Sequence, residues 1–382
     1  MAVPVLGRSL AALAGAALVF TAVASAVGTL IVARPVANWL TRGVDRIVDQ
    51  GFWLATRPID DYERRDRVLA GQMAAVLLSQ LAAWLLLSFF GYSLVLWPFV
   101  HGGVTTALTE AGSAMFTLGF ATPNGSVPVA IVFLAAATGI GLVSLQIAYL
   151  PTLYAAFNRR ETAVALLNAR AGVPSWGPEL LARTHYALGT GVSTIDTLPD
   201  LYEQWERWAA DVAESHATYL PLVRCRSPRP LSSWVTALLA VLDSAALFLA
   251  LSPKASPVVP ARLCLRSGFL CFTRIAQAMG LDVPDEPDPL NGVKLSYQEY
   301  LDAVARLREV SFPIERDPAD AWPDFVGWRV NYEQAAYAVA AEVSAVPALW
   351  SGPRRRPSAA IPPIRPPRGR PLGDSSKHTE RS

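Results

Sequence analysis

The sequence predicts an all-α membrane protein with three transmembrane helices, a re-entrant loop between the second and the third, and a cytoplasmic α-helical domain. The first observation is that the stretch between Arg67 and Arg159 holds one formal charge, that of Glu110. A charge at the bilayer centre costs about 2.5–3.5 kcal/mol on insertion scales. The second is length: a helix crosses the hydrocarbon in about 20 residues, so this stretch has room for two spans and a segment between them.

The composition is that of a membrane protein with a soluble part attached. Of the 382 residues, 52% are hydrophobic and only 17% are charged, and the net charge is +2. The charges are concentrated in segments and alternate in sign, so the net charge says little about partners. We expect no nucleic-acid partner. The three cysteines, Cys225, Cys264 and Cys271, do not form the pattern of a disulfide framework.

Residues 1–33 are expected to form the first transmembrane helix. Their apolar run, from Ser9 to Ala33, is long enough to cross a bilayer. The alternative is a cleaved secretory signal, because Arg8 precedes the run and Ala24-Ser25-Ala26 has the form of a cleavage site. The run continues past that site without a break, which favours a retained span.

Residues 34–67 form an arginine-rich connector that we expect to be cytoplasmic. They hold seven arginines interleaved with acidic residues, and arginines near span ends mark the cytoplasmic side whereas acidic residues contribute little. Their apolar residues fall on one face of a helix: Val36, Leu40, Val44, Ile47 and Val48. Such a helix would lie along the inner leaflet near anionic lipid or serve as a solvated connector.

Residues 68–158 hold the other two spans. The second falls within Val68–Val100, with Tyr92 and Trp97 expected as anchors at the outer interface. The third runs from about Pro128 to Leu150, and the arginines at 159 and 160 place its end inside. The outer connection carries no Lys or Arg, so the topology of a multi-pass plasma-membrane protein with a cytoplasmic C-terminal domain is consistent throughout.

Residues 159–351 are expected to form the cytoplasmic helical domain. Apolar residues recur there at helical spacing: Leu180, Leu181, Leu201, Trp205, Trp208 and Val212. The uncharged run Pro230–Pro253 resembles a fourth span, but Asp243 at its centre favours a buried core helix. Residues Trp322–Trp328 are expected to form a capping turn, and Trp350 to close the domain. The Pro- and Arg-rich residues 352–382 lack the apolar content to fold and are expected to be disordered.

The connection Val100–Ser126 has the layout of a short helix that enters the membrane and an irregular return. Its helix is expected over Val104–Phe116, and it breaks into Thr117-Leu118-Gly119-Phe120-Ala121 before a polar turn. Non-helical backbone at membrane depth is tolerated only where protein buries it or where it lines a water-filled path. Backbone carbonyls can replace the hydration shell of a cation, and glycine lets the chain change handedness between successive carbonyls.

This segment, placed between two spans, resembles the selectivity filter TVGYG of potassium channels. With the helix that follows it and AYLPTLYAAFNRRE, the chain looks like the potassium-channel-like membrane proteins of actinobacteria. The resemblance implies a homotetramer in the bilayer, with Thr117, Leu118, Gly119, Phe120 and Ala121 as a filter for potassium or another monovalent cation. It implies no cofactor.

The sequence departs from the filter pattern at two positions. Ala121 stands where the second filter glycine is expected, and a side chain in a left-handed conformation costs roughly 1–2 kcal/mol. Thr122 stands where an aspartate usually follows, which removes negative charge from the outer mouth. These departures predict cation conduction without strict potassium selectivity. The alternative interpretation of the whole connection is an ordinary external hairpin of a protein that does not conduct.

Three further residues are candidates for roles around the loop. Glu110 is expected in the pore helix, where it either supports the filter or faces the outer vestibule, or is a solvated carboxylate. Gly139 and Gly141 in the third span are either a gating hinge or small residues that allow close packing. No catalytic or metal-ligating pattern is found, so we expect no enzyme. The function expected is a cation channel, for potassium in the first place, with a pore-loop filter and a cytoplasmic domain that regulates or assembles it. The alternative is a non-conducting membrane-anchored sensor or scaffold with a degenerate pore fold.

Overall fold

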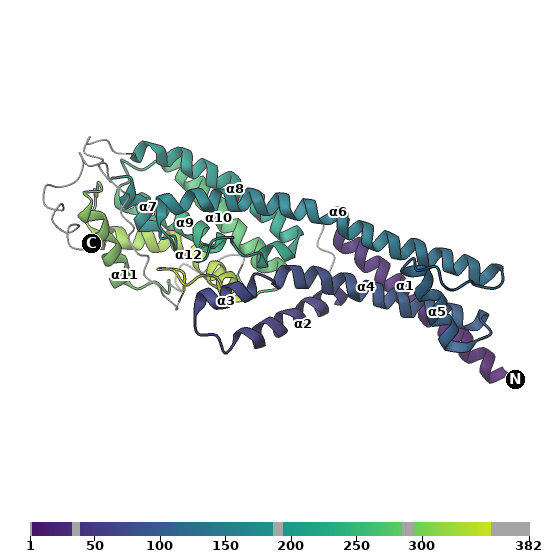
Figure 1. Cartoon of the computed structure of the whole chain (residues 1–382). Coiled ribbons are helices and arrows are strands. Elements are labelled where there is room, and N and C mark those ends of the chain that lie inside the picture. The colour runs from purple at the N-terminus through teal and green to yellow at the C-terminus, as the bar shows by residue number, and fades with distance from the viewer. Residues whose placement is uncertain (1, 33–38, 186–193, 285–286, 288–292, 353–382) are drawn as a thin grey trace, which may run out of the picture. The chain divides into compact units, whose positions relative to one another are not determined.

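The computed structural model describes residues 2–32, 39–185, 194–284, 287 and 293–352, and in these ranges every regular element is a helix. The chain divides between Phe157 and Asn158 into two compact units, whose helices Figure 1 labels. Four of the described helical segments are long and apolar enough to cross a membrane: Gly7–Leu30, Tyr62–Phe99, Ser126–Ala171 and Trp234–Leu251. The all-α prediction is therefore confirmed for these ranges.

Unit 1 contains the long apolar helices that the sequence predicts. Its elements are α1 (Ala2–Leu30), α2 (Trp39–Thr56), α3 (Tyr62–Leu69), α4 (Gln72–Leu96), a 3₁₀ turn (Trp97–Phe99), α5 (Gly103–Met115) and the first part of α6 (Ser126–Ala171). The surfaces of α1, α4 and α6 carry many exposed large apolar side chains, among them Phe20, Leu78, Leu86, Phe133 and Ile147. In water such a surface would be costly, whereas lipid requires it.

Helices α1 and α4 lie side by side because two glycines let their backbones meet (Figure 1). A Cβ on Gly15 would lie 2.4 Å from the carbonyl oxygen of Gly91, and a Cβ on Gly91 would lie 2.8 Å from that of Gly15. In lipid the hydrophobic effect does not drive helices together, and small residues at a crossing let the backbones approach closely enough for van der Waals contact. Further along the same pair, the indole of Trp84 donates to Ser25 Oγ at 2.9 Å.

Tyr92 does not serve as the interfacial anchor that the sequence predicts. Its side chain is buried, and its hydroxyl forms a hydrogen bond of 2.7 Å with Thr138 Oγ1 of α6. The hydroxyl therefore joins α4 to α6. A polar group inside a helix pair is more stable when bonded to a neighbouring helix than when left unpaired.

Helix α6 does not end with the predicted third span at Leu150. It continues through Pro151 to Ala171 and crosses the boundary between the two units. Proline removes one backbone donor and clashes with the preceding turn, which led the sequence argument to a helix end there. The residues after it are mostly good helix formers, from Thr152-Leu153 to Leu167, and the helix persists.

Unit 2 is a helical domain built around α9. Its elements are the end of α6, α7 (Gly177–Arg183), α8 (Leu198–Thr218), α9 (Trp234–Leu251), α10 (Val258–Ala278), α11 (Tyr297–Glu309) and α12 (Pro318–Glu342), with 3₁₀ turns at Ile195–Thr197 and Leu220–Arg224. The predicted core residues are buried here: Leu180, Leu181, Leu201, Trp205, Trp208 and Val212. Residues Trp322–Trp328 belong to the start of α12, so the predicted capping turn is wrong. The predicted disordered tail lies outside the described residues, apart from Gly352.

Helix α9 is a buried core helix, as predicted, although its length and composition also suit a span. Its apolar window is 100% buried inside the unit, whereas the corresponding windows of the other three segments are 22–28% buried. It is contacted by α7, α8, α10 and α12. The domain therefore covers this helix on all sides.

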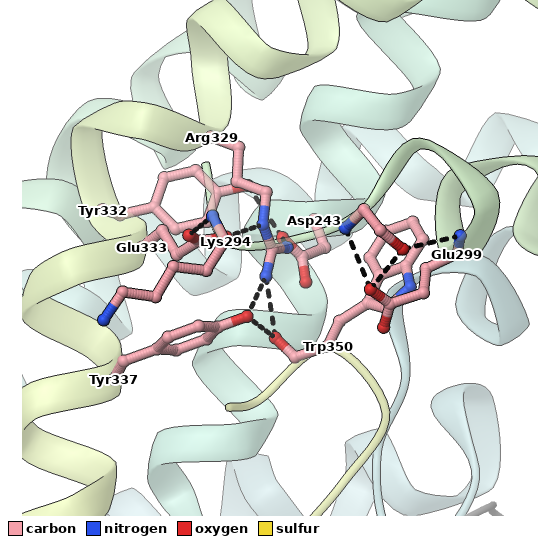
Figure 2. Close-up of polar contacts among 9 residues, drawn as sticks. Asp243, Lys294, Glu299, Arg329, Tyr332, Glu333, Tyr337 and Trp350 are labelled. Atoms are coloured by element: carbon pink, nitrogen blue, oxygen red, sulfur yellow. Dashed lines mark hydrogen bonds and ion pairs between the residues drawn. The ribbon is translucent and has the colours of Figure 1, made fainter. Parts of the chain in front are cut away.

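The carboxylate of Asp243, midway along α9, meets a buried arginine of α12. Arg329 donates to Asp243 through Nη1 and to Glu333 through Nε at 2.7 Å, as Figure 2 shows. Tyr332 donates its hydroxyl to Asp243 at 2.9 Å. Buried charges persist where they are paired and hydrogen-bonded, and this network meets that condition in the most apolar helix of the unit.

The same arginine closes the C-terminal end of unit 2. Its Nη2 donates to the carbonyl of Trp350 at 2.7 Å, and the hydroxyl of Tyr337 donates to that carbonyl at 3.0 Å. The indole of Trp350 is buried in the core. The prediction that Trp350 closes the domain is confirmed, and Arg329 is the residue that anchors it.

The end of α6 enters unit 2 with a second buried arginine. Arg160 donates to Glu161 and to the carbonyls of Leu222 and Cys225, each at 2.8 Å, and its Nη1 lies 2.9 Å from Nε2 of His216. Burial lowers the pKa of His216 well below its usual value, so the ring is neutral and can accept from the guanidinium. These contacts hold the end of α6 within the domain.

Candidate functional site

The candidate site is the connection between α4 and α6, where the sequence predicts a filter. Helix α5 (Gly103–Met115) closely matches the expected pore helix over Val104–Phe116. Its buried face consists of Ala107, Glu110, Ala111, Ser113 and Met115, and α5 packs against α4. Residues 118–124 after it have no regular secondary structure.

Helix α5 ends in a Schellman motif centred on Thr117. The N–H of Leu118 donates to the carbonyl of Ser113 at 2.8 Å, and the N–H of Thr117 donates to that of Ala114 at 3.0 Å. This pattern requires a left-handed residue, usually glycine, and Thr117 has φ +57°. A threonine held there stores backbone strain, a feature that clusters at functional sites.

Left-handed backbone occurs at Thr117 and Gly119, which has φ +72°. Ala121 does not have a positive φ, so the strain that the sequence argument places at Ala121 is instead at Thr117. The two left-handed residues alternate with Leu118 and Phe120, neither of which has a positive φ. The backbone thus changes handedness from residue to residue across the first four filter positions.

Ser113 gathers the backbone donors of the segment. Its carbonyl accepts from Leu118 N at 2.8 Å and from Gly119 N at 3.3 Å, and its side-chain Oγ accepts from Ala121 N at 3.0 Å. In a trans peptide unit the carbonyl points opposite to the N–H that follows it, and these bonds are trans. The carbonyls of Thr117, Leu118 and Phe120 therefore point away from Ser113.

The backbone carbonyls of the candidate filter have no hydrogen-bond partner within the described residues. Within the described residues, the carbonyl oxygens of Thr117–Ala121 accept no hydrogen bond from the chain. The residues Thr117, Leu118, Gly119 and Phe120 are all exposed. The hydroxyl of Thr117 donates to the carbonyl of Phe116 at 2.8 Å, which uses its proton and leaves the lone pairs of its oxygen as acceptors. Successive unpaired backbone oxygens are the ligand set that a dehydrated cation requires.

Glu110 makes no hydrogen bond with the candidate filter among the described residues. Its side chain is 7% exposed, and no hydrogen bond joins its carboxylate to Thr117–Ala121. Oε2 of Glu110 is buried and has no hydrogen-bond partner among the described residues. The residue lies on the buried face of α5. Unit 1 therefore does not show Glu110 as a solvated surface carboxylate.

The two glycines of α6 differ in their surroundings. A Cβ on Gly139 would lie 2.2 Å from the carbonyl oxygen of Met115, whereas a Cβ on Gly141 would meet nothing within 4 Å. Gly139 thus allows the end of α5 to pack against α6. The helix is continuous through both positions, and a hinge at Gly141 stays a prediction.

The sequence argument missed Ser113. The available signal was a single small hydroxyl residue on the apolar face of α5, four positions before Thr117. Serine in a helix usually bonds its own preceding turn, and nothing in the sequence shows that its side chain instead accepts from Ala121. Among the described residues, no group of three or more His, Cys, Asp or Glu could hold a metal ion.

Comparison with known proteins identifies no relative: no protein-family model, no curated protein and no solved structure matches this chain.

Proposed function

We propose that this chain is the subunit of a cation channel, in which α5 and Thr117–Ala121 form a re-entrant loop and the carbonyls of that segment bind the ion. The observation that carries the proposal is the set of hydrogen bonds to Ser113, because they turn three carbonyls away from α5 and leave them unpaired. Such a segment is tolerated at membrane depth only where protein buries it or where it lines a water-filled path, and the exposure of Thr117–Phe120 favours the second case.

In this proposal α1, α4 and α6 cross the bilayer and α9 does not. The arginines of residues 34–67 and those at 159 and 160 support a cytoplasmic location for unit 2. Reporter fusions after Arg57 and after Ala171 test this topology, and both are expected to report the cytoplasmic side. A reporter on the outer side at either position contradicts it.

The filter of one chain is one wall of a pore, so the proposal requires an oligomer. Four copies around one axis would bring four sets of carbonyls together, as in the potassium channels that the segment resembles. Potassium or another monovalent cation is the ion that uncharged carbonyl rings select. Mass measurement of the purified protein in detergent is expected to give four chains.

Ion flux in liposomes tests the function directly. Purified full-length chain is expected to dissipate a potassium gradient, and Gly119→Ala is expected to abolish the flux while the oligomer still forms. The reason is the left-handed backbone at Gly119, φ +72°, which an alanine adopts only with strain. The control is Gly327→Ala in α12, where a Cβ meets nothing within 4 Å.

The second candidate is a membrane-anchored scaffold that keeps a pore-like fold without conducting. It is favoured by the large apolar side chains of Leu118 and Phe120, which are 62% and 65% exposed, and by the absence of an acidic residue at Thr122. A wild-type chain that forms the oligomer and passes no ion under any voltage or pH supports this candidate and contradicts the first.

A further inference from the structure

Helix α2 presents basic and apolar side chains away from the rest of unit 1. Trp39 is 68% exposed and Ile47 is 71% exposed, and Arg42 and Arg46 are exposed as well. On a helix of 3.6 residues per turn these four positions lie on one side. The exposed side of the first turns of α2 therefore combines two arginines with two large apolar side chains.

The acidic residues of α2 are bonded to α4. Gln80 of α4 donates through Nε2 to Asp45 at 2.7 Å, and Gln72 donates to Asp49 at 2.8 Å. Both carboxylates are thereby held against α4. The alternating signs in the sequence thus separate in the structure, because the acids bond α4 and the arginines remain outside.

The same two hydrogen bonds set the level of α2 along α4 (Figure 1). Trp97 follows the last residue of α4 and lies on the outer side in the proposed topology, and the hydrocarbon is crossed in about 20 residues. Counting back by that length from Trp97 reaches the interval between Gln72 and Gln80. The turn of α2 that carries Arg46 and Ile47 is bonded across this interval, at the inner boundary of the bilayer.

We propose that the first turns of α2 are a binding surface for the headgroup of an anionic phospholipid in the inner leaflet. Arg42 and Arg46 would contact the phosphate, since guanidinium binds phosphate oxygens in pairs. Ile47 would lie at the interface. Trp39 is eight residues earlier on a helix that runs antiparallel to α4, so it would lie about 12 Å nearer the bilayer centre, beside the acyl chains. Arg42, about 6 Å deeper than Arg46, would reach the headgroup by extending its side chain. The proposal rests on α4 crossing the bilayer, as proposed above, and does not require the chain to conduct.

The depth of α2 can be measured with nitroxide labels on the full chain in lipid nanodiscs. Ile47→Cys and Leu54→Cys form a matched pair, because both side chains are exposed, 71% and 61%, and lie about 10 Å apart along the axis. Leu86→Cys on α4, 52% exposed, reports whether α4 is in the bilayer. Accessibility to oxygen and to a water-soluble nickel chelate is expected to place position 86 in the hydrocarbon, 47 at the interface and 54 in water.

Lipid binding is measured by titrating fluorescent phosphatidylglycerol or phosphatidylcholine into the detergent-solubilised protein. Arg42→Gln and Arg46→Gln are each expected to weaken phosphatidylglycerol binding about fivefold, with phosphatidylcholine binding unchanged. Arg57→Gln is the charge-matched control, since Arg57 lies beyond the C-terminal end of α2 and over the ring of Trp53, and it is expected to change neither.

The outcomes separate the alternatives. A label at position 47 in water while position 86 is in the hydrocarbon overturns the lipid surface and leaves the channel proposal intact. Position 47 shielded from both reagents means that protein covers it, which also overturns the lipid assignment. A label at position 86 in water contradicts the membrane placement on which both proposals rest. Equal losses in the Arg57 variant reduce the effect to net charge and overturn the specific surface.

Discussion

Ser113 and Ala121 are joined by a hydrogen bond in which the backbone N–H of Ala121 donates to the side-chain oxygen of Ser113 at 3.0 Å. The bond spans the whole candidate filter, from the last turn of α5 to the fifth filter residue. Together with the two donors that bond the Ser113 carbonyl, it ties the segment back to its own helix.

Ser113→Ala is expected to fold and assemble but to lose ion discrimination. The alanine keeps the backbone carbonyl and its two bonds and removes only the acceptor of Ala121 N, a contact that contributes about 0.5–1.5 kcal/mol. The Phe120 carbonyl would then no longer be held in one direction. The readout is the ratio of potassium to sodium flux in liposomes. Ser126→Ala, at an exposed serine of the same connection, is the control, and an equal change in both would contradict the role of Ser113.

Thr117→Gly is expected to stabilise the protein and impair conduction. Glycine at the left-handed position of a Schellman motif removes a strain of about 1 kcal/mol, because Thr117 has φ +57°. The same change deletes the hydroxyl oxygen next to the unpaired backbone carbonyls of the candidate filter. Thermal unfolding and flux are measured on one preparation. Lower stability would show that the left-handed conformation is not strained, and unchanged flux would show that Thr117 does not line the proposed ion path.

Gly139→Ala is expected to disturb the packing of α5 on α6. The added methyl would lie 2.2 Å from the Met115 carbonyl oxygen, so one helix must shift, a change that costs roughly 1–3 kcal/mol in a packed core. Gly141→Ala adds the same methyl into open space and is expected to leave the melting temperature unchanged or slightly raised. Equal melting temperatures for the two variants would rule out the close approach at Gly139.

Removal of the two partners in the α9–α12 network is expected to have unequal effects. Arg329→Met leaves the carboxylates of Asp243 and Glu333 buried without their cation and should cost about 3–5 kcal/mol. Asp243→Asn leaves Arg329 paired with Glu333 and should cost far less at pH 7.5. Thermal unfolding of the full chain measures both, and a greater loss for Asp243→Asn would contradict this account.

The pH dependence of the same network has a definite sign. Burial raises the pKa of Asp243 to about 6, although Arg329 and the Tyr332 hydroxyl favour the ionised form. The stabilisation from protonating Asp243 in the folded state is fully present below pH 4 and is lost as the pH rises through about 6. The stability of wild type relative to Asp243→Asn should therefore fall between pH 4 and pH 7. A difference that stays constant over this range would show that Asp243 does not titrate there.

The long apolar segments, the helical class and the core of unit 2 could be predicted because they depend on local composition and period. A long run without charges identifies a segment that suits lipid or a protein core. A repeat of 3.6 residues identifies the buried face of a helix such as α8. The burial of α9 also followed from one residue, since Asp243 in the middle of an apolar run is costly in lipid. The sequence could not show that Arg329 is its partner.

What only the tertiary structure decided is where polar groups find partners distant in the sequence. Tyr92 was predicted to be an interfacial anchor because tyrosine has an amphipathic ring, but its hydroxyl forms a hydrogen bond with Thr138 of α6. The acids of α2 bond α4 and leave its arginines outside. In the candidate filter, the residue types suggested the chemistry, whereas the strained position proved to be Thr117. The physical reason is that a helix period determines which face is apolar, while hydrogen-bond partners depend on which elements fold against each other.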